Sequence, residues 1–332
     1  MTDNVPAKLT TRRNAIAVAA GFFAGLIVVG LPYIAVWIHA VATGAVAPGS
    51  SMTSVSGFNA SLTLLFPAVQ GLVMGLALGR PRQGVGPTSL LSLAMVLVDI
   101  VAAVVIIREG VICLIIMSPL LFLMIWVGAF LGRAILFNVG RNVQVSLVPL
   151  VMLAVFAETR LPPPDFSTQV TDSVTVNAPP EYVWRYVTTY PENRDPPEYW
   201  LWQAGLPYPT QSIADAPEVG AKRICAFNTG IAFEERIIEL QPNEVMTFQV
   251  TAQPDHPEVT GHFQFDRGQI RLTRNPDGTT TLTATSWYRL FVRPAPYFNW
   301  WTEDITRQVH FRVLNHMKHL AEADYRAEAP PS

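Results

Sequence analysis

The N-terminal half of the chain contains apolar runs that are long enough to cross a lipid bilayer as helices. Crossing the hydrocarbon core of a bilayer takes about 20 apolar residues in helical form. Four runs reach that length, at residues 14–41, 58–79, 88–107 and 110–131. A fifth run, residues 143–157, has about 15 residues and either spans a thinned bilayer or lies at its surface. The sequence therefore predicts an all-α transmembrane bundle of about five helices.

Charged residues are distributed unevenly between the two halves of the chain. They make up 14% of all residues, and only seven of them lie in residues 14–157. An ordinary soluble protein has about 25%. Residues 158–332 hold 15 basic and 22 acidic side chains, which predicts a water-soluble and acidic half. Such a half is unsuited to nucleic acid, because phosphate binding needs concentrated Lys and Arg.

Basic residues in the short loops predict the orientation of the bundle, since such residues stay on the cytoplasmic side. They lie before the first run and after the second and fourth runs, at Lys8, Arg12, Arg13, Arg80, Arg82, Arg133 and Arg141. We therefore expect a bacterial-type inner membrane protein with a cytoplasmic N-terminus. If the fifth run spans, the C-terminal half is periplasmic or otherwise extracytoplasmic, which is the alternative we favour. If it does not span, that half is cytoplasmic.

Two features inside the apolar runs bear on packing and function. Glycines recur at a spacing of four residues, at Gly21, Gly25, Gly71, Gly75, Gly79, Gly128 and Gly132. Such stripes let helices approach closely, either within one bundle or between copies in a homo-oligomer. Asp99 is an acidic residue deep inside a run. It is either a hydrogen-bonded packing residue or part of a proton or substrate path.

The sequence pattern of the C-terminal half is typical of an antiparallel sheet with one long helix. After a proline-rich linker at residues 158–167, an alternating run predicts a strand, and two short helical segments follow. Six further alternating runs are separated by turn signals such as Asn228-Thr229-Gly230. The last predicted element is a long amphipathic helix over about residues 296–326. This pattern predicts an α+β domain in which a seven-stranded antiparallel sheet wraps around the helix.

This order resembles a known superfamily. Residues 174–184 read Val-Thr-Val-Asn-Ala-Pro-Pro-Glu-Tyr-Val-Trp. This motif and the amphipathic C-terminal helix resemble those of START-like, or SRPBCC, helix-grip domains. That superfamily includes polyketide cyclases/dehydratases and pollen-allergen-like proteins. The resemblance implies a cavity for an apolar ligand, in a lipid carrier, a ligand sensor or a cyclase. The predicted domains are a cytoplasmic tail (1–13), a transmembrane domain (14–157), the linker (158–167), the helix-grip domain (168–326) and a tail (327–332).

The register of one predicted hairpin indicates one wall of the expected cavity. Gly230 suits the left-handed position of a three-residue hairpin loop. Phe227 then pairs with Ile231, Cys225 with Phe233, and Arg223 with Glu235. Because strand side chains alternate, these residues share one face, which we assign to the cavity. Arg223 then orients an acidic or carbonyl head group, or else the charged pair is structural or faces outward.

The long helix and the last strand supply the other walls. An inward stripe is predicted at Phe298, Ile305, Val309, Val313, Met317 and Leu320, with Thr306 and His316 on the same side. The predicted ligand-binding residues are Arg223, Phe227, Phe233, Glu235, Tyr288, Thr306, Val309, Val313 and His316. His316 is also a candidate acid or base.

Three classes of function remain open. The first is a membrane-anchored domain that binds or transfers an apolar molecule or lipid, and the second is a cyclase or dehydratase. The third is a structural membrane-assembly protein, indicated only by the glycine stripes. We expect no cofactor and no metal, because the sequence shows no nucleotide-binding glycine loop, serine nucleophile elbow or metal motif. A dense set of aromatic residues near Trp200 and Trp300 favours either a membrane interface or a folded core.

Overall fold

The computed structural model divides the chain into two compact units, and each is described by itself. It describes residues 7–44, 60–79, 84–107, 109–138, 153–158, 161 and 165–328. The first unit comprises residues 1–164 together with residues 291–294. The second unit comprises residues 165–290 and 295–332.

The first unit is helical throughout its described core. Its elements are α1 (Ala7–Gly25), η1 (Leu26–Gly30), α2 (Leu31–Ala42), η2 (Ser61–Leu65), α4 (Phe66–Leu78), α5 (Val85–Ala102), η3 (Ala103–Ile107) and α6 (Val111–Asn138). Among the described residues, four helices are long and apolar enough to cross a membrane: Thr11–Ala42, Ser61–Leu78, Val85–Ile106 and Val111–Ile135. They correspond to the first four predicted runs. The fifth run lies outside the described residues except for residues 153–157, which are helical.

Glycines pack α4 directly against α6. A Cβ atom added at Gly71 or Gly75 on α4 would collide with the backbone of Ile125 or Ala129 on α6. The contact is reciprocal, because a Cβ at Gly128 would meet the backbone of Ala68 on α4. Helix backbones come this close only where the side chain is missing. The predicted packing of these stripes within one bundle is therefore confirmed.

Two carboxylates of this unit, the buried Asp99 and the half-buried Glu158, have polar partners. The side-chain amide of Gln70 on α4 donates a 2.7 Å hydrogen bond to Asp99 on α5. Glu158 accepts hydrogen bonds from the backbone N–H groups of Ala60 and Ser61, at 2.9 Å and 2.8 Å. Those groups stand at the start of a helix, where N–H groups have no partner within the helix. The carboxylate of Glu158 thus caps that helix from a residue about a hundred positions away.

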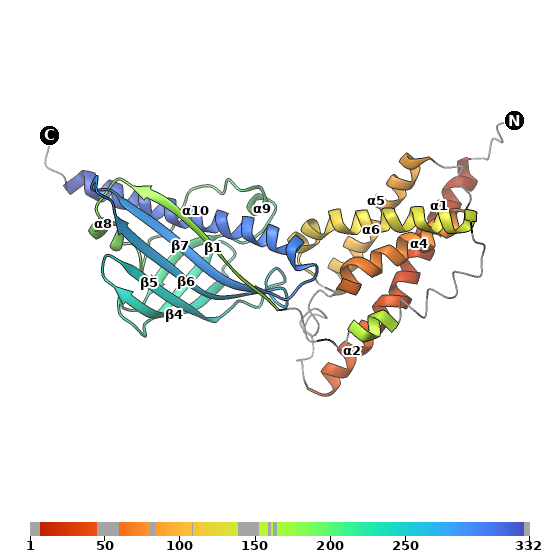
Figure 1. Ribbon diagram of the computed structural model, residues 1–332, viewed down its shortest axis with the longest axis horizontal. Coiled ribbons are helices and arrows are strands. Elements are labelled where there is room, and N and C mark those ends of the chain that lie inside the picture. The colour runs from red at the N-terminus through yellow and green to blue at the C-terminus, as the bar shows by residue number, and fades with distance from the viewer. Residues whose placement is uncertain are drawn as a thin grey trace. The chain divides into compact units, whose positions relative to one another are not determined.

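The second unit is a seven-stranded sheet with one long helix (Figure 1). Its strands are β1 (Phe166–Val176), β2 (Pro209–Ala214), β3 (Lys222–Phe227), β4 (Ala232–Gln241), β5 (Val245–Ala252), β6 (Phe263–Arg274) and β7 (Thr280–Leu290). Its helices are α8 (Pro180–Trp184), α9 (Trp200–Gln203) and α10 (Ala295–Glu328). The strand order is β1-β7-β6-β5-β4-β3-β2, and every neighbouring pair is antiparallel. The predicted helix-grip architecture is confirmed.

Two predicted elements differ in length from the observed ones. The helix expected from Tyr182 to Thr189 ends as a helix at Trp184, because the β-branched residues that follow are poor helix formers. The sixth strand was expected from residue 269 and begins at Phe263. The extension was not predicted because it contains Gly268, and glycine is unusual inside a strand. Here it is needed, because a Cβ at Gly268 would collide with the ring of Phe248 on β5.

The buried face of α10 is also rotated from the predicted stripe. The residues that are buried are His310, Leu314, Met317 and Ala321. Of these, only Met317 belongs to the predicted stripe, and Val309 and Val313 are half-buried beside it. Val313 and Leu320 of the predicted stripe still pack against the core, so the prediction was wrong only about the centre of the buried face. It followed apolar character and took no account of polar partners. His310 is drawn inward by polar partners on the sheet, described below.

The glycine packing yields the first prediction. Gly75→Ala should lower the stability of the helical unit by about 1–3 kcal/mol, the usual cost of overpacking, although alanine is the better helix former. Gly86→Ala is the matched control, because an added Cβ there meets nothing within 4 Å. Unfolding of the two variants in mild detergent measures the difference. An unchanged Gly75→Ala protein would contradict the tight α4–α6 contact.

Candidate functional site

The hairpin between β3 and β4 has the predicted register. Gly230 has φ +81°, and its N–H donates to the carbonyl of Phe227 at 3.0 Å. Cys225 pairs with Phe233 and Arg223 pairs with Glu235 across the two strands. The side chains of Arg223 and Glu235 are 3% and 2% exposed and form an ion pair. Both charges therefore lie inside the domain rather than on the solvent face of the sheet.

Arg223 has further partners besides Glu235. Its Nε donates a 3.1 Å hydrogen bond to the carbonyl of Thr188, and its guanidinium lies 4.7 Å from the ring centroid of Phe248. Burial raises the pKa of Glu235 above its ordinary value, and the guanidinium opposes that rise. Burial also raises the pKa of the nearby Cys225 thiol to about 12, so this thiol stays protonated. The group is a neutral, buried ion pair with an unreactive cysteine beside it.

Aromatic rings form a continuous row next to this pair. Phe227 and Phe233 have ring centroids 5.3 Å apart, and Phe233 and Phe265 follow at 6.2 Å. Phe265 and Phe248 continue the row at 6.1 Å, edge to face. Such spacings are typical of favourable aromatic packing. The part of the inner wall next to this ion pair, on β3 to β6, is thus lined by aromatic rings.

The remaining predicted residues lie on β7 and α10. Tyr288 is buried, and its hydroxyl donates a 3.1 Å hydrogen bond to Asn299. Thr306, Val309, Val313 and His316 are half-buried. The Nε2 atom of His316 donates to the carbonyl of Pro191 at 3.0 Å.

Tyr190 links two parts of the predicted site. Its ring centroid lies 5.8 Å from that of His316, and its hydroxyl interacts with Cys225. Tyr190 was not predicted as a site residue, since it lies in an irregular segment without an alternating pattern. The lining of one common pocket by all nine predicted residues stays a prediction.

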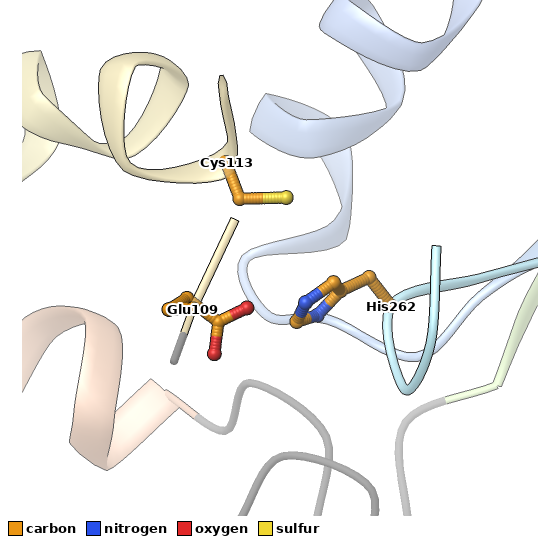
Figure 2. Close-up of side chains that lie close together, drawn as sticks. All are labelled: Glu109, Cys113 and His262. Atoms are coloured by element: carbon orange, nitrogen blue, oxygen red, sulfur yellow. The ribbon is translucent and has the colours of Figure 1, made fainter. Parts of the chain in front are cut away.

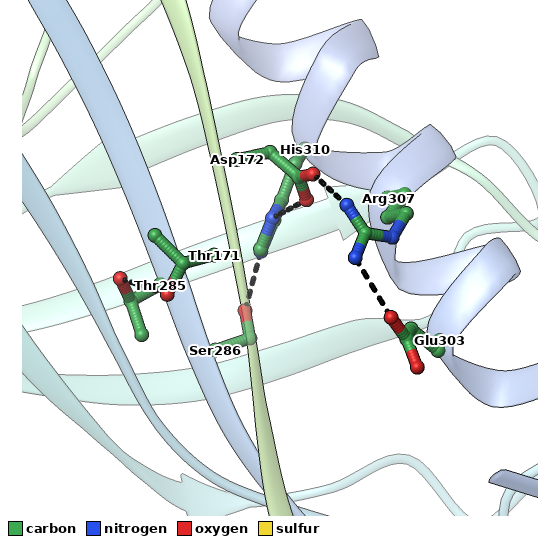
Figure 3. Close-up of polar contacts among 7 residues, drawn as sticks. All are labelled: Thr171, Asp172, Thr285, Ser286, Glu303, Arg307 and His310. Atoms are coloured by element: carbon green, nitrogen blue, oxygen red, sulfur yellow. Dashed lines mark hydrogen bonds and ion pairs between the residues drawn. The ribbon is translucent and has the colours of Figure 1, made fainter.

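A second polar cluster was not predicted and crosses the interior between β1, β7 and α10 (Figure 3). His310 on α10 lies between Asp172 on β1 and Ser286 on β7. Its Nδ1 is 2.8 Å from Oδ2 of Asp172, and its Nε2 is 2.8 Å from Oγ of Ser286. All three residues are buried. This arrangement is a hydrogen-bonded chain of carboxylate, imidazole and hydroxyl.

Two further residues of α10 extend the chain toward the surface. Arg307 donates to the other oxygen of Asp172 at 2.6 Å and to Glu303 at 2.7 Å. Glu303, Arg307 and His310 are spaced by four and three residues, so they share one helical face. That spacing is visible in the sequence. It was missed because its partner Asp172 lies far away in the chain, at an inward position of a strand.

The charge states of this chain follow from its partners. Burial lowers the pKa of His310 below its ordinary value of 6.5, although Asp172 opposes the shift. The imidazole is therefore neutral at pH 7. A carboxylate can only accept hydrogen bonds, so Nδ1 of His310 carries the proton and Nε2 accepts from the hydroxyl of Ser286. His310 thereby presents its basic nitrogen to Ser286.

Figure 2 draws three residues whose side chains can bind metal ions, Glu109, Cys113 and His262. Glu109 and Cys113 belong to the first unit, whereas His262 belongs to the second. Each unit therefore contributes at most two ligands of this set, fewer than the three protein ligands of a typical catalytic zinc site. We assign no metal site to these residues.

The buried histidine yields the second prediction. The stability of the chain should fall as the pH is lowered from 7 to 5. The pKa of His310 is depressed in the folded state, so the unfolded chain takes up a proton near pH 6.5 that the folded chain does not. Thermal unfolding followed by tryptophan fluorescence measures this. His310→Gln should flatten the pH dependence, and equal slopes in both proteins would contradict the assignment.

A family model matches the C-terminal half of the chain. Residues 167–322 match the family described as polyketide cyclase / dehydrase and lipid transport. The comparison with curated proteins gave no match.

Solved structures similar to this chain cover about half of it. A protein from Nitrosospira multiformis is 19% identical, with a TM-score of 0.33, over 48% of this chain and 99% of its own. The Zhui aromatase/cyclase from Streptomyces sp. R1128 is 16% identical, with a TM-score of 0.35, over 50% and 100%. Truncated norcoclaurine synthase from Thalictrum flavum is 10% identical, with a TM-score of 0.33, over 48% and 96%. At such identities and TM-scores these likenesses bear on no functional conclusion. By its family match and by its fold, the C-terminal half of the chain is therefore similar to the polyketide cyclase/dehydrase and lipid transport family, as the sequence analysis predicted.

Proposed function

We propose that this protein is a membrane-anchored helix-grip domain that binds or transfers an apolar small molecule or lipid between its sheet and α10. The observation that carries the proposal is the presence, in one chain, of a lipid-transport-type family match and four helices able to cross a membrane. An anchor of this kind raises the local concentration of a ligand dissolved in the bilayer. The aromatic row of Phe227, Phe233, Phe265 and Phe248 supports an apolar ligand, because binding sites are mostly apolar with a few polar groups.

The polar part of the proposed site is the pair Arg223–Glu235. Because the pair is neutral as a whole, a carboxylate ligand would add an uncompensated charge to a buried place. Of the two head groups considered from the sequence, a neutral carbonyl therefore suits Arg223 better than an acid. A carbonyl only accepts hydrogen bonds, and a guanidinium only donates them.

Exposed tryptophans support an approach of the domain to lipid. Trp200 on α9 is 49% exposed and Trp300 on α10 is 64% exposed. Both rings pack against Trp301, with centroids 6.3 Å and 4.9 Å away. Large aromatic side chains are unusual on a surface that meets only water, whereas they are enriched at membrane interfaces. We propose that this cluster contacts the bilayer in which the chain is anchored.

The third prediction concerns the ligand. Native mass spectrometry of the full chain, after gentle extraction, should detect a retained apolar molecule. Val309→Trp should fill the proposed site and lower the retained fraction at least about tenfold, which corresponds to about 1.4 kcal/mol. Asn315→Trp is the matched control on the exposed side of α10. Equal retention in both variants would contradict ligand binding beside Val309.

The fourth prediction concerns the side of the membrane. We propose five spans and an extracytoplasmic C-terminal domain. In a background that lacks Cys113 and Cys225, Asp277→Cys should react with a membrane-impermeant thiol reagent in intact cells, because Asp277 is exposed in the turn between β6 and β7. A cysteine introduced at Thr2 should stay protected until the membrane is permeabilised. Protection of the cysteine at position 277 as well would indicate four spans and a cytoplasmic domain.

A further inference from the structure

Ser286, His310 and Asp172 have the connectivity of a nucleophile, its general base and the group that orients the base. The hydroxyl of Ser286 donates to Nε2 of His310 over 2.8 Å, and Nδ1–H of His310 donates to Asp172 over 2.8 Å. Catalytic triads are recognised by this geometry and by these roles rather than by sequence position. We propose that Ser286 is the nucleophile of an acyl-transfer site that cleaves apolar esters.

The base is held in place by more than one contact. Asp172 is fixed through its second oxygen by Arg307, which is itself held by Glu303. The side chain of Asp172 is only 3% exposed, so its negative charge needs both of its partners. Rotation of the carboxylate away from His310 would break the bond to Arg307 as well. His310 is thereby kept in the tautomer that accepts a proton at Nε2.

The order of the three residues places Ser286 at one end of the hydrogen-bonded chain. All three are buried, with Ser286, Asp172 and His310 at 9%, 7% and 5% exposure. The other end is closed by Arg307, which is bonded to Asp172, and by Glu303. The hydroxyl of Ser286 is therefore the end group of the chain inside the domain. General-base catalysis needs this order, because the substrate has to reach the hydroxyl and not the base.

The chemistry balances with an ester and water as the only reactants. Oγ of Ser286 bonds to the carbonyl carbon of the ester, and its proton passes to Nε2 of His310. The bond from the carbonyl carbon to the alcohol oxygen then breaks, and the alcohol leaves with that proton. Water attacks the acylated serine in the same way, with His310 again taking and returning the proton. The acid is released and the hydroxyl of Ser286 is restored.

The surroundings of Ser286 define the substrate class. Ala284 and Tyr288 flank it on the inward face of β7, and Val170 is its neighbour on β1. These neighbours suit an uncharged ester with an apolar acyl chain. The inference rests on the proposed function in one respect, because the ester would enter the same interior as the proposed ligand.

An alkyl fluorophosphonate probe tests the nucleophile directly in the full chain. The serine oxygen displaces fluoride from phosphorus, so intact mass and peptide mapping locate the adduct. We expect one adduct, at Ser286, which is absent from Ser286→Ala. His310→Gln and Asp172→Asn should slow labelling at least about hundredfold. Ser173→Ala is the matched control, since Ser173 is exposed on the other face of β1 and should label at the wild-type rate.

Two further measurements separate chemistry from folding. The labelling rate of the unaltered chain should rise with pH while His310 loses its proton and then level off, a profile that a structural network would not give. Ser286→Ala should retain its apolar ligand in native mass spectrometry. Retained ligand without any adduct in the wild-type chain would overturn this inference and leave the proposed function standing. An adduct that persists in Ser286→Ala would also overturn it.

Discussion

The burial of the Asp172 carboxylate is the constraint on which the second unit depends. A charge that is removed from water is tolerated only when it is paired and hydrogen-bonded. Asp172 meets that need with two residues of α10, Arg307 and His310, at 2.6 Å and 2.8 Å. These two bonds set the rotation of the long helix against the sheet. They thereby decide that Leu314 and Met317 enter the core, where both are fully buried.

The parts of the domain that are governed by local rules could be predicted from the sequence. Gly230 fixed the loop of one hairpin, and period-two alternation then paired Arg223 with Glu235 correctly. The rotation of α10 could not be predicted in this way. It depends on a bond between residues 138 positions apart, and apolar periodicity placed His316 rather than His310 on the inward side of the helix. Ser286 was missed for the same reason, because the sequence pattern does not show its contact with His310. In the sequence it is one small residue in an alternating strand.

The apolar runs of the first half were predicted from length and composition, because the hydrocarbon core of a bilayer sets both. The contacts between those helices could not be predicted in the same way. The spacing of the glycines indicated close approach, but not which helices meet. The structure pairs Gly71 and Gly75 of α4 with α6, and it brings Gly21 of α1 against Gln70 and Met74 of α4. A hydrogen-bonded packing role was one of the two alternatives for Asp99, and its partner is an uncharged amide from the neighbouring helix.

This glycine packing has a consequence for how copies of the chain can associate. The glycines of α4 and α6 already face the backbone of the other helix within a single chain, with no room for even a methyl group. A second copy can reach them only after α6 has separated from α4. Any oligomer that uses these faces would therefore be a helix exchange between chains, and it would compete with the folded monomer at every concentration. The remaining outer faces of the bundle are the ones on which copies can meet without that competition.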